Sequence, residues 1–161
     1  MRKIQYFAYG SNMNLDQMAR RCPDAEVVGA VRLDGYRLAF AGVATILPDP
    51  GSHVDGVLWE ISAEDEKRLD FYEGFPRLYG KETITVTDKA GNSYEVIVYT
   101  MNPPYRDQPE KPSVPYLHGI VEGCRQNGID PQSVLDAVER TKQEMEKHQE
   151  RSGKRRGRQE R

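Results

Sequence analysis

Glu73 is the carboxylate whose place in the sequence best suits proton transfer. It ends a predicted helix that begins at Ser62. Around it stand aromatic residues and a glycine: Phe71, Tyr72, Gly74 and Phe75. The partial negative charge at a helix C-terminus disfavours another negative charge, and an aromatic, partly desolvated setting raises a carboxyl pKa. A carboxylate with a raised pKa is a better general base near neutral pH. The alternative is an exposed glutamate that happens to end a helix.

The second candidate is the stretch Tyr9-Gly10-Ser11-Asn12, which closes an apolar run that starts at Ile4. Gly, Ser and Asn tolerate unusual backbone angles and offer small polar groups and free amides. Asn14 is predicted to cap a following helix, with Gln17 as the partner in a capping box. A strand, a glycine turn and a helix start can aim several N–H groups at a carboxylate or an oxyanion. The alternative is a plain structural turn.

Two tyrosines follow predicted loops from which a phenol can reach the same turn. Tyr79 comes one loop after the Glu73 helix, and Tyr116 follows Pro112-Ser113-Val114-Pro115. The alternative is that both fill an interface between sheet and helix.

Other familiar chemistries lack their signatures in the sequence. Ser11 lies in no GxSxG motif, so a serine nucleophile has no support. No histidine or cysteine pair has metal-ligand spacing, and neither a GxGxxG nor a P-loop pattern is present. We therefore expect no metal and no cofactor. The histidines left without a role are His53, His118 and His148.

Length and composition bound the class of protein. The 161 residues, 37% hydrophobic and 30% charged, fit one soluble domain with a real core. No apolar run approaches a membrane span, and the N-terminus shows no signal-peptide pattern. The two cysteines, Cys22 and Cys124, make no disulfide framework. We expect a cytoplasmic protein.

The charge is distributed unevenly along the chain. Residues 151–161 carry six basic residues and one acidic residue, net +5, which leaves 17 basic and 24 acidic residues, net −7, in the first 150. This pattern predicts one domain over residues 1–147 and a basic, disordered tail over residues 148–161. An acidic globule is not typical of nucleic-acid-binding domains. The alternative use of the tail is weak, salt-dependent contact with RNA, DNA or an acidic partner.

The order of predicted elements indicates an α+β fold. Strand, helix, a block of strands, helix, hairpin and two helices follow one another, which is not a regular βαβ alternation. Within the block, a turn is predicted at Asp34-Gly35, and the Pro/Gly-rich residues 48–52 are predicted to interrupt the strands. We expect a mixed or antiparallel sheet that can close into a barrel.

Several of these motifs together resemble the γ-glutamylcyclotransferase family. They include Phe7-Ala8-Tyr9-Gly10-Ser11-Asn12-Met13, Gly56-Val57-Leu58-Trp59, Leu69-Asp70-Phe71-Tyr72-Glu73-Gly74, and Pro112-Ser113-Val114-Pro115-Tyr116 continuing to Asn127-Gly128. The resemblance covers residues 4 to about 130, and the basic tail lies outside it.

The resemblance implies a small mixed β-barrel flanked by helices, and a reaction without metal or cofactor. A γ-glutamyl amide is cleaved when the substrate's own α-amine attacks the γ-carbonyl, which yields 5-oxoproline and an amine or amino acid. The family's catalytic glutamate falls on Glu73. Its substrate-holding residues fall on Tyr9, Gly10, Ser11, Asn12 and Tyr116, and on Tyr79 across a loop of different length.

Three hypotheses follow from the sequence. The first is a cofactor-independent γ-glutamylcyclotransferase, an acyltransferase or lyase by reaction type, that uses Glu73 as general acid/base. The second is a non-catalytic module of the same fold that binds a γ-glutamyl or carboxylate ligand. The third is an interaction protein recruited through its basic tail. The expected partner in the first two is a small molecule, and none of the three involves a membrane.

Overall fold

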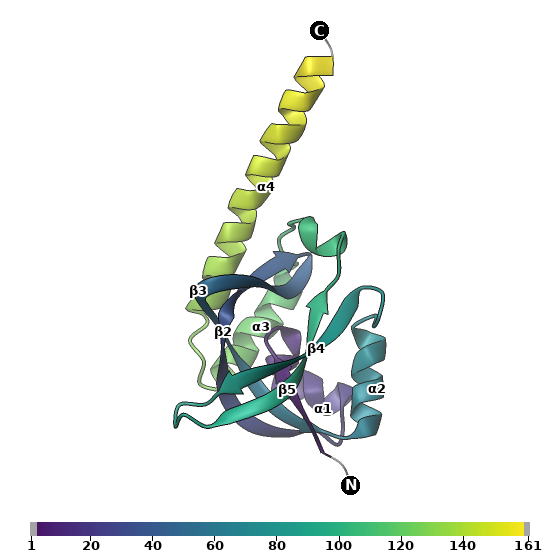
Figure 1. Cartoon of the computed structure of the whole chain (residues 1–161), viewed down its shortest axis with the longest axis vertical. Helices are drawn as coiled ribbons and strands as arrows, with labels where there is room; N and C mark the ends of the chain where they lie inside the picture. Colours follow the sequence, from purple (N-terminus) through teal and green to yellow (C-terminus); the bar gives the residue numbers. More distant parts are fainter. Residues whose placement is uncertain (1–2, 160–161) are drawn as a thin grey trace.

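The computed structural model describes residues 3–159 (Figure 1). The strands are β1 (Ile4–Ala8), β2 (Glu26–Ala41), β3 (Val43–Ile61), β4 (Tyr79–Thr87) and β5 (Ser93–Met101). The α-helices are α1 (Leu15–Arg21), α2 (Ala63–Tyr72), α3 (Val114–Gln126) and α4 (Gln132–Gln159). Two short 3₁₀ turns complete the described elements, η1 (Ser11–Met13) and η2 (Tyr105–Asp107).

The five strands close into a barrel in the order β1-β3-β2-β4-β5. The β1–β5 contact is parallel and pairs Tyr6 with Ile97, whereas the other neighbours are antiparallel. Pairing between β2 and β4 is limited to a single recorded pair, Arg32 with Thr87. The predicted α+β fold, a small mixed barrel with flanking helices, is therefore confirmed (Figure 1).

The hairpin of β2 and β3 is longer than the sequence predicted. The expected turn at Asp34-Gly35 is wrong, because β2 continues through it with a shift of register. The interruption expected at residues 48–52 is also wrong, because it lies within β3 as a bulge: Tyr36 pairs with Pro48 and Asp34 with His53. Bulges accommodate proline and the extra residues that a strongly bent barrel strand requires.

Apolar side chains from every strand fill the barrel and the space beneath the helices. Phe7, Leu58, Val86, Val96 and Val98 are completely or almost completely buried. Valines 96 and 98 lie two residues apart, as expected when one face of a strand points into a core. This packing fixes β1 rigidly, and β1 leads directly into the turn that the sequence singled out.

Helices α2 and α3 begin as predicted. Ser62 and Asp65 form a full capping box at the start of α2, and the backbone of Glu73 caps its end. Ser113 caps α3, with Pro115 in its first turn. Gly74, with φ of 63°, then turns the chain away from α2. Sequence-local signals therefore place Glu73 at the edge of the barrel.

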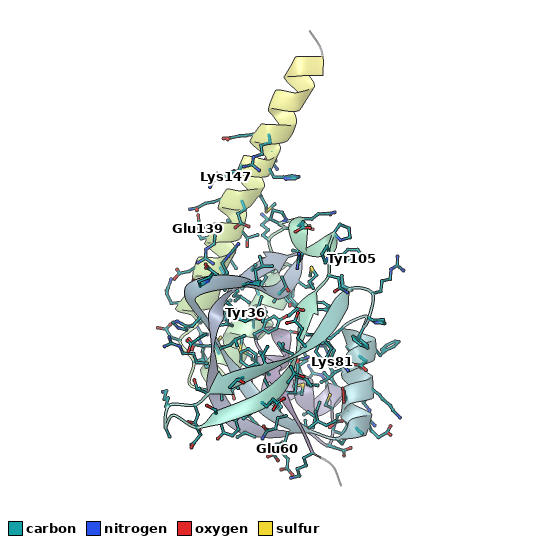
Figure 2. The ribbon with its side chains drawn as sticks, in the orientation of Figure 1. Tyr36, Glu60, Lys81, Tyr105, Glu139 and Lys147 are labelled. Atoms are coloured by element: carbon teal, nitrogen blue, oxygen red, sulfur yellow. The ribbon has the colours of Figure 1, made fainter. Side chains whose placement is uncertain are left out.

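The C-terminal segment α4 is helical as far as Gln159 and extends well beyond the barrel (Figure 1). A disordered tail over residues 148–161 stays a prediction. The first turns of α4 pack through Val134, Ala137, Val138 and Thr141, whereas Lys147 lies on the part that projects (Figure 2). Lys, Arg, Gln and Glu favour helix, which suits this extension. Residues 160–161 lie outside the described residues, and a separate domain over residues 1–147 stays a prediction. No helix in the described chain is long and apolar enough to cross a membrane.

Candidate active site

The glycine turn after β1 lies against the β3 backbone and α3. A Cβ atom on Gly10 would lie 3.1 Å from the Ala44 Cβ and 3.5 Å from the Tyr116 hydroxyl, so only glycine fits without displacement. Outside the regular helices and strands of the described chain, neither the Gly10 nor the Ser11 amide donates to a backbone carbonyl. The turn therefore presents N–H groups beside a tyrosine hydroxyl, as the sequence suggested.

Three contacts hold this turn in place. The Trp59 indole N–H donates to the Asn12 carbonyl at 3.0 Å, and the Asn127 amide donates to the Met13 carbonyl at 2.9 Å. A Cβ on Gly123 would lie 2.7 Å from the Asn14 nitrogen, so glycine allows α3 to approach the turn closely. The turn is thus rigid before any ligand arrives.

The Asn12 side chain links the turn to Glu73 through hydrogen bonds. This side chain is buried, and its Nδ2 donates to the Tyr6 hydroxyl at 3.0 Å and to Glu73 Oε1 at 3.4 Å. Its Oδ1 accepts from Gln17 Nε2 at 3.1 Å and from an Arg21 guanidinium nitrogen at 3.0 Å. The Asn14 cap is confirmed, but the capping-box role of Gln17 is wrong because its side chain bonds Asn12 instead.

Burial raises the pKa of Glu73 to about 7, and the positive charge of Arg21 opposes the rise. The aromatic setting differs from the one expected, because Phe71 is 82% exposed. Tyr72, one of the expected neighbours, does line the pocket. The other tyrosines beside Glu73 come from distant parts of the chain: Tyr6, Tyr9, Tyr79 and Tyr116. A carboxyl with this pKa can both accept and donate a proton near neutral pH.

A cavity of about 170 Å³ separates Glu73 from the turn. Its wall includes Ser11, Ala44, Tyr79, Tyr116 and Arg21. Typical ligand sites span about 300–1,000 Å³, so this cavity suits a small group. No cluster of three or more His, Cys, Asp or Glu side chains suited to a metal occurs among the described residues.

The pocket tyrosines differ in what their hydroxyls can still do. Tyr79 donates to the Ala44 carbonyl at 2.5 Å and Tyr9 to the Tyr99 carbonyl at 2.6 Å, so both keep only acceptor capacity. The Tyr116 hydroxyl instead accepts from the Ala44 amide at 3.0 Å, which leaves its proton for another partner. Burial raises the pKa of Tyr116 to about 12, so it stays a neutral donor at physiological pH.

The structure thus brings the predicted residues together around one cavity, where they occupy different positions. Tyr9, Ser11, Glu73, Tyr79 and Tyr116 line the cavity. Gly10 packs under it, and Asn12 stands behind it as a bridge to Glu73.

The sequence analysis did not predict two polar lining residues, Tyr6 and Arg21, and it named Tyr72 only as an aromatic neighbour of Glu73. A signal for Arg21 was present, because Gln17 and Arg21 are four residues apart and so share the α1 face beside Asn12. Tyr6 gave no such signal, because an aromatic residue in a buried strand reads as core.

Comparison with known proteins agrees with this geometry. The family model described as "Gamma-glutamyl cyclotransferase, AIG2-like" matches residues 6–118. The chain belongs to that family. It is 31% identical to the gamma-glutamylcyclotransferase of Bos taurus and 32% identical to that of Mus musculus, each over 83% of this chain and 78% of the relative.

The fold agrees as well. A solved structure titled "Gamma-glutamyl cyclotransferase" superposes with a TM-score of 0.73 at 28% sequence identity, covering 88% of this chain and 87% of that one. The family match includes the turn, Glu73, Tyr79 and Tyr116, whereas α4 lies beyond it. Membership in the AIG2-like gamma-glutamyl cyclotransferase family, expected from the sequence motifs, is therefore confirmed.

Proposed function

We propose that the protein is a cyclotransferase that cleaves a γ-glutamyl amide, releasing 5-oxoproline and an amine or amino acid. The observation that carries this proposal is the placement of Glu73, with a pKa of about 7, across a small cavity from the Gly10-Ser11 turn. Family membership supports the class of reaction.

The proposed reaction needs one proton carrier and no water. Glu73 takes a proton from the substrate's α-ammonium, and the free amine attacks the γ-carbonyl carbon. A new C–N bond closes the five-membered ring, and the original amide C–N bond breaks. Glu73 then returns its proton to the departing nitrogen, and the attacking nitrogen gives up a second proton to that same nitrogen as it becomes the ring amide. The amine leaves as an ammonium, the carboxylate is regenerated, and atoms and charge balance.

The rest of the pocket would orient the substrate. The Gly10 and Ser11 amides are suited to the glutamyl carboxylate or to the carbonyl oxygen as it gains negative charge. Tyr116 can donate a hydrogen bond, whereas Tyr79 and Tyr9 can accept one from an ammonium. Holding amine and carbonyl together in a small cavity favours the cyclic geometry.

The decisive variant is Glu73→Gln, which keeps shape and removes the proton carrier. We expect kcat for 5-oxoproline release to fall by roughly 10²- to 10⁴-fold, the usual contribution of a general acid/base. Glu64→Gln, an exposed glutamate on the same helix, is the matched control and should keep full activity. Near-normal turnover by Glu73→Gln would sink the assignment.

A pH profile and a substrate panel test the rest of the proposal. The acid limb of kcat/KM should rise with pH through about 7 as Glu73 ionises. Dialysis against EDTA should leave the rate unchanged, since the proposal includes no metal. Binding of γ-glutamyl compounds without any 5-oxoproline release would favour the non-catalytic binding module instead.

A further inference from the structure

Arg21 is a pocket cation without an anionic partner. No ion pair within the described residues involves its guanidinium. One guanidinium nitrogen donates to Asn12 Oδ1 at 3.0 Å, and the group has five N–H donors in all. A half-buried cation that lines a cavity and keeps unused donors is well suited to bind a ligand carboxylate.

Tyr72 fixes the orientation of this cation. The Arg21 guanidinium carbon lies 4.7 Å from the centroid of the Tyr72 ring. Stacking of this kind holds the planar group and leaves its edges free for the bidentate hydrogen bonds that carboxylates accept. Tyr72 is 52% exposed, whereas Tyr79 in the same lining is 4% exposed, so the cavity wall is more accessible to solvent at Tyr72, beside Arg21.

The position of Arg21 relative to Glu73 indicates which part of a substrate it meets. Both side chains contact the same Asn12 amide, Glu73 through Nδ2 and Arg21 through Oδ1. Glu73 must reach the departing nitrogen, and in an amino-acid leaving group the carboxylate stands one carbon away from that nitrogen. The buried part of the lining, which includes Tyr6, Tyr9 and Tyr79 and is joined by Ser11, is left for the glutamyl part.

We propose that Arg21, held by Tyr72, is a specificity-determining residue that binds a carboxylate on the leaving group. The preferred substrates are then γ-glutamyl derivatives of single amino acids, whose carboxylate lies next to the scissile amide, rather than γ-glutamyl derivatives of simple amines. This inference rests on the proposed cyclotransferase function.

The test uses two substrates that differ only in this carboxylate, γ-glutamyl-alanine and γ-glutamyl-ethylamine. We expect wild-type kcat/KM to favour the alanine compound by about 10- to 100-fold, the range of a charge-assisted hydrogen bond. Arg21→Gln should remove most of this preference, because kcat/KM for the alanine compound falls further than kcat/KM for the ethylamine compound. Both substrates are measured at pH 8.5 to limit the effect of the Arg21 charge on ionisation of Glu73. Arg20→Gln, an exposed neighbour on the same helix, is the matched control.

Equal losses on both substrates in Arg21→Gln would overturn the inference, because Arg21 would then act on the glutamyl part or on Glu73. The absence of a wild-type preference would overturn it too. Isothermal titration calorimetry measures the affinity of both compounds for Glu73→Gln and for the double variant Glu73→Gln/Arg21→Gln. These affinities do not depend on turnover, so they distinguish failure of the Arg21 inference from failure of the proposed function. If the protein turned over neither compound, the proposed function would fail. The Arg21 subsite would still stand if replacing Arg21 lowered affinity for the alanine compound alone.

Discussion

The two ends of α2 treat a carboxylate in opposite ways. At its start, Asp65 is fully buried, and its side chain accepts from the Ser62 amide at 3.4 Å and from Arg68 at 2.9 Å. At its end, Glu73 has a single described donor, the Asn12 amide at 3.4 Å. Asp65 and Glu73 belong to the same short helix, yet the fold gives the first carboxylate several hydrogen-bond donors and the second carboxylate few.

The cations beside α2 show the same contrast. Lys81 on β4 points at the helix, where its ammonium lies 2.7 Å from Glu66 and 2.8 Å from Asp70 (Figure 2). Asp70 in turn accepts from the Tyr99 hydroxyl at 2.6 Å. Arg21, by contrast, lines the cavity with an amide oxygen and an aromatic ring as its recorded contacts.

This difference separates charges that hold the fold from charges that remain available for chemistry. Buried groups with full sets of partners stabilise a structure, whereas a group with few partners keeps a perturbed pKa and the capacity to bind a ligand. Neither Glu73 nor Arg21 forms an ion pair among those recorded for the described residues, and both line the same cavity. Their convergence is what distinguishes this end of α2.

The contrast predicts that removing the compensated carboxylate harms the fold rather than the chemistry. Asp65→Ala deletes half of the capping box and leaves Arg68 without its partner. We expect a loss of about 2–4 kcal/mol in the free energy of unfolding, measured with urea, from the lost cap and ion pair. The folded fraction should keep kcat within about twofold.

Glu64→Ala, on the exposed side of the same helix turn, is the control for Asp65→Ala and should change stability by less than about 0.5 kcal/mol. If Asp65→Ala left stability unchanged, the two ends of α2 would not differ in the way argued.

At the C-terminal end of α2, replacing the carboxylate is expected to raise the free energy of unfolding instead of lowering it. The pKa of Glu73 is about 7 in the folded protein, above the ordinary value of 4.5 for a glutamate. The folded state therefore holds this proton more tightly, and its contribution to stability is present below pH 4.5 and lost as pH rises through 7. Glu73→Gln, which never ionises, should match wild type at pH 4.5 and exceed it by about 1–3 kcal/mol at pH 8.5.

Urea unfolding of Glu73→Gln and wild type at the two pH values measures this difference. A variant that is less stable than wild type at pH 8.5 would show that ionised Glu73 is compensated after all.

The sequence predicted those features that depend on local signals. Ser62, Asn14 and Ser113 cap their helices as expected, and Gly74 ends the Glu73 helix. The barrel and the convergence of Glu73 with the glycine turn came from the family resemblance, because no local pattern states which strands become neighbours. The turn predicted at Asp34-Gly35 failed because glycine and aspartate also favour bulges within long, bent strands.

The environment of Glu73 could not be predicted from its neighbours in the chain. Phe71 adjoins it in sequence yet points to solvent, whereas Tyr6, more than sixty residues earlier, shares its cavity. Desolvation depends on tertiary packing. The sequence analysis attributed the raised pKa to aromatic neighbours in the chain, which is only part of the cause. The compensation of Lys81 was equally hidden, because its partners lie on a different element.

Lys81 offers the smallest test of the comparison. Lys81→Met keeps the length of the side chain and removes the charge that holds α2 against β4. The three charged groups are partly exposed, so we expect a loss of about 1 kcal/mol in the free energy of unfolding. Turnover of the ethylamine compound and its pH profile should not change, because Lys81 does not line the cavity. A shift of the acid limb in this variant would mean that the ion pairs of Lys81 with Glu66 and Asp70 also affect the pKa of Glu73. The two ends of α2 would then be coupled.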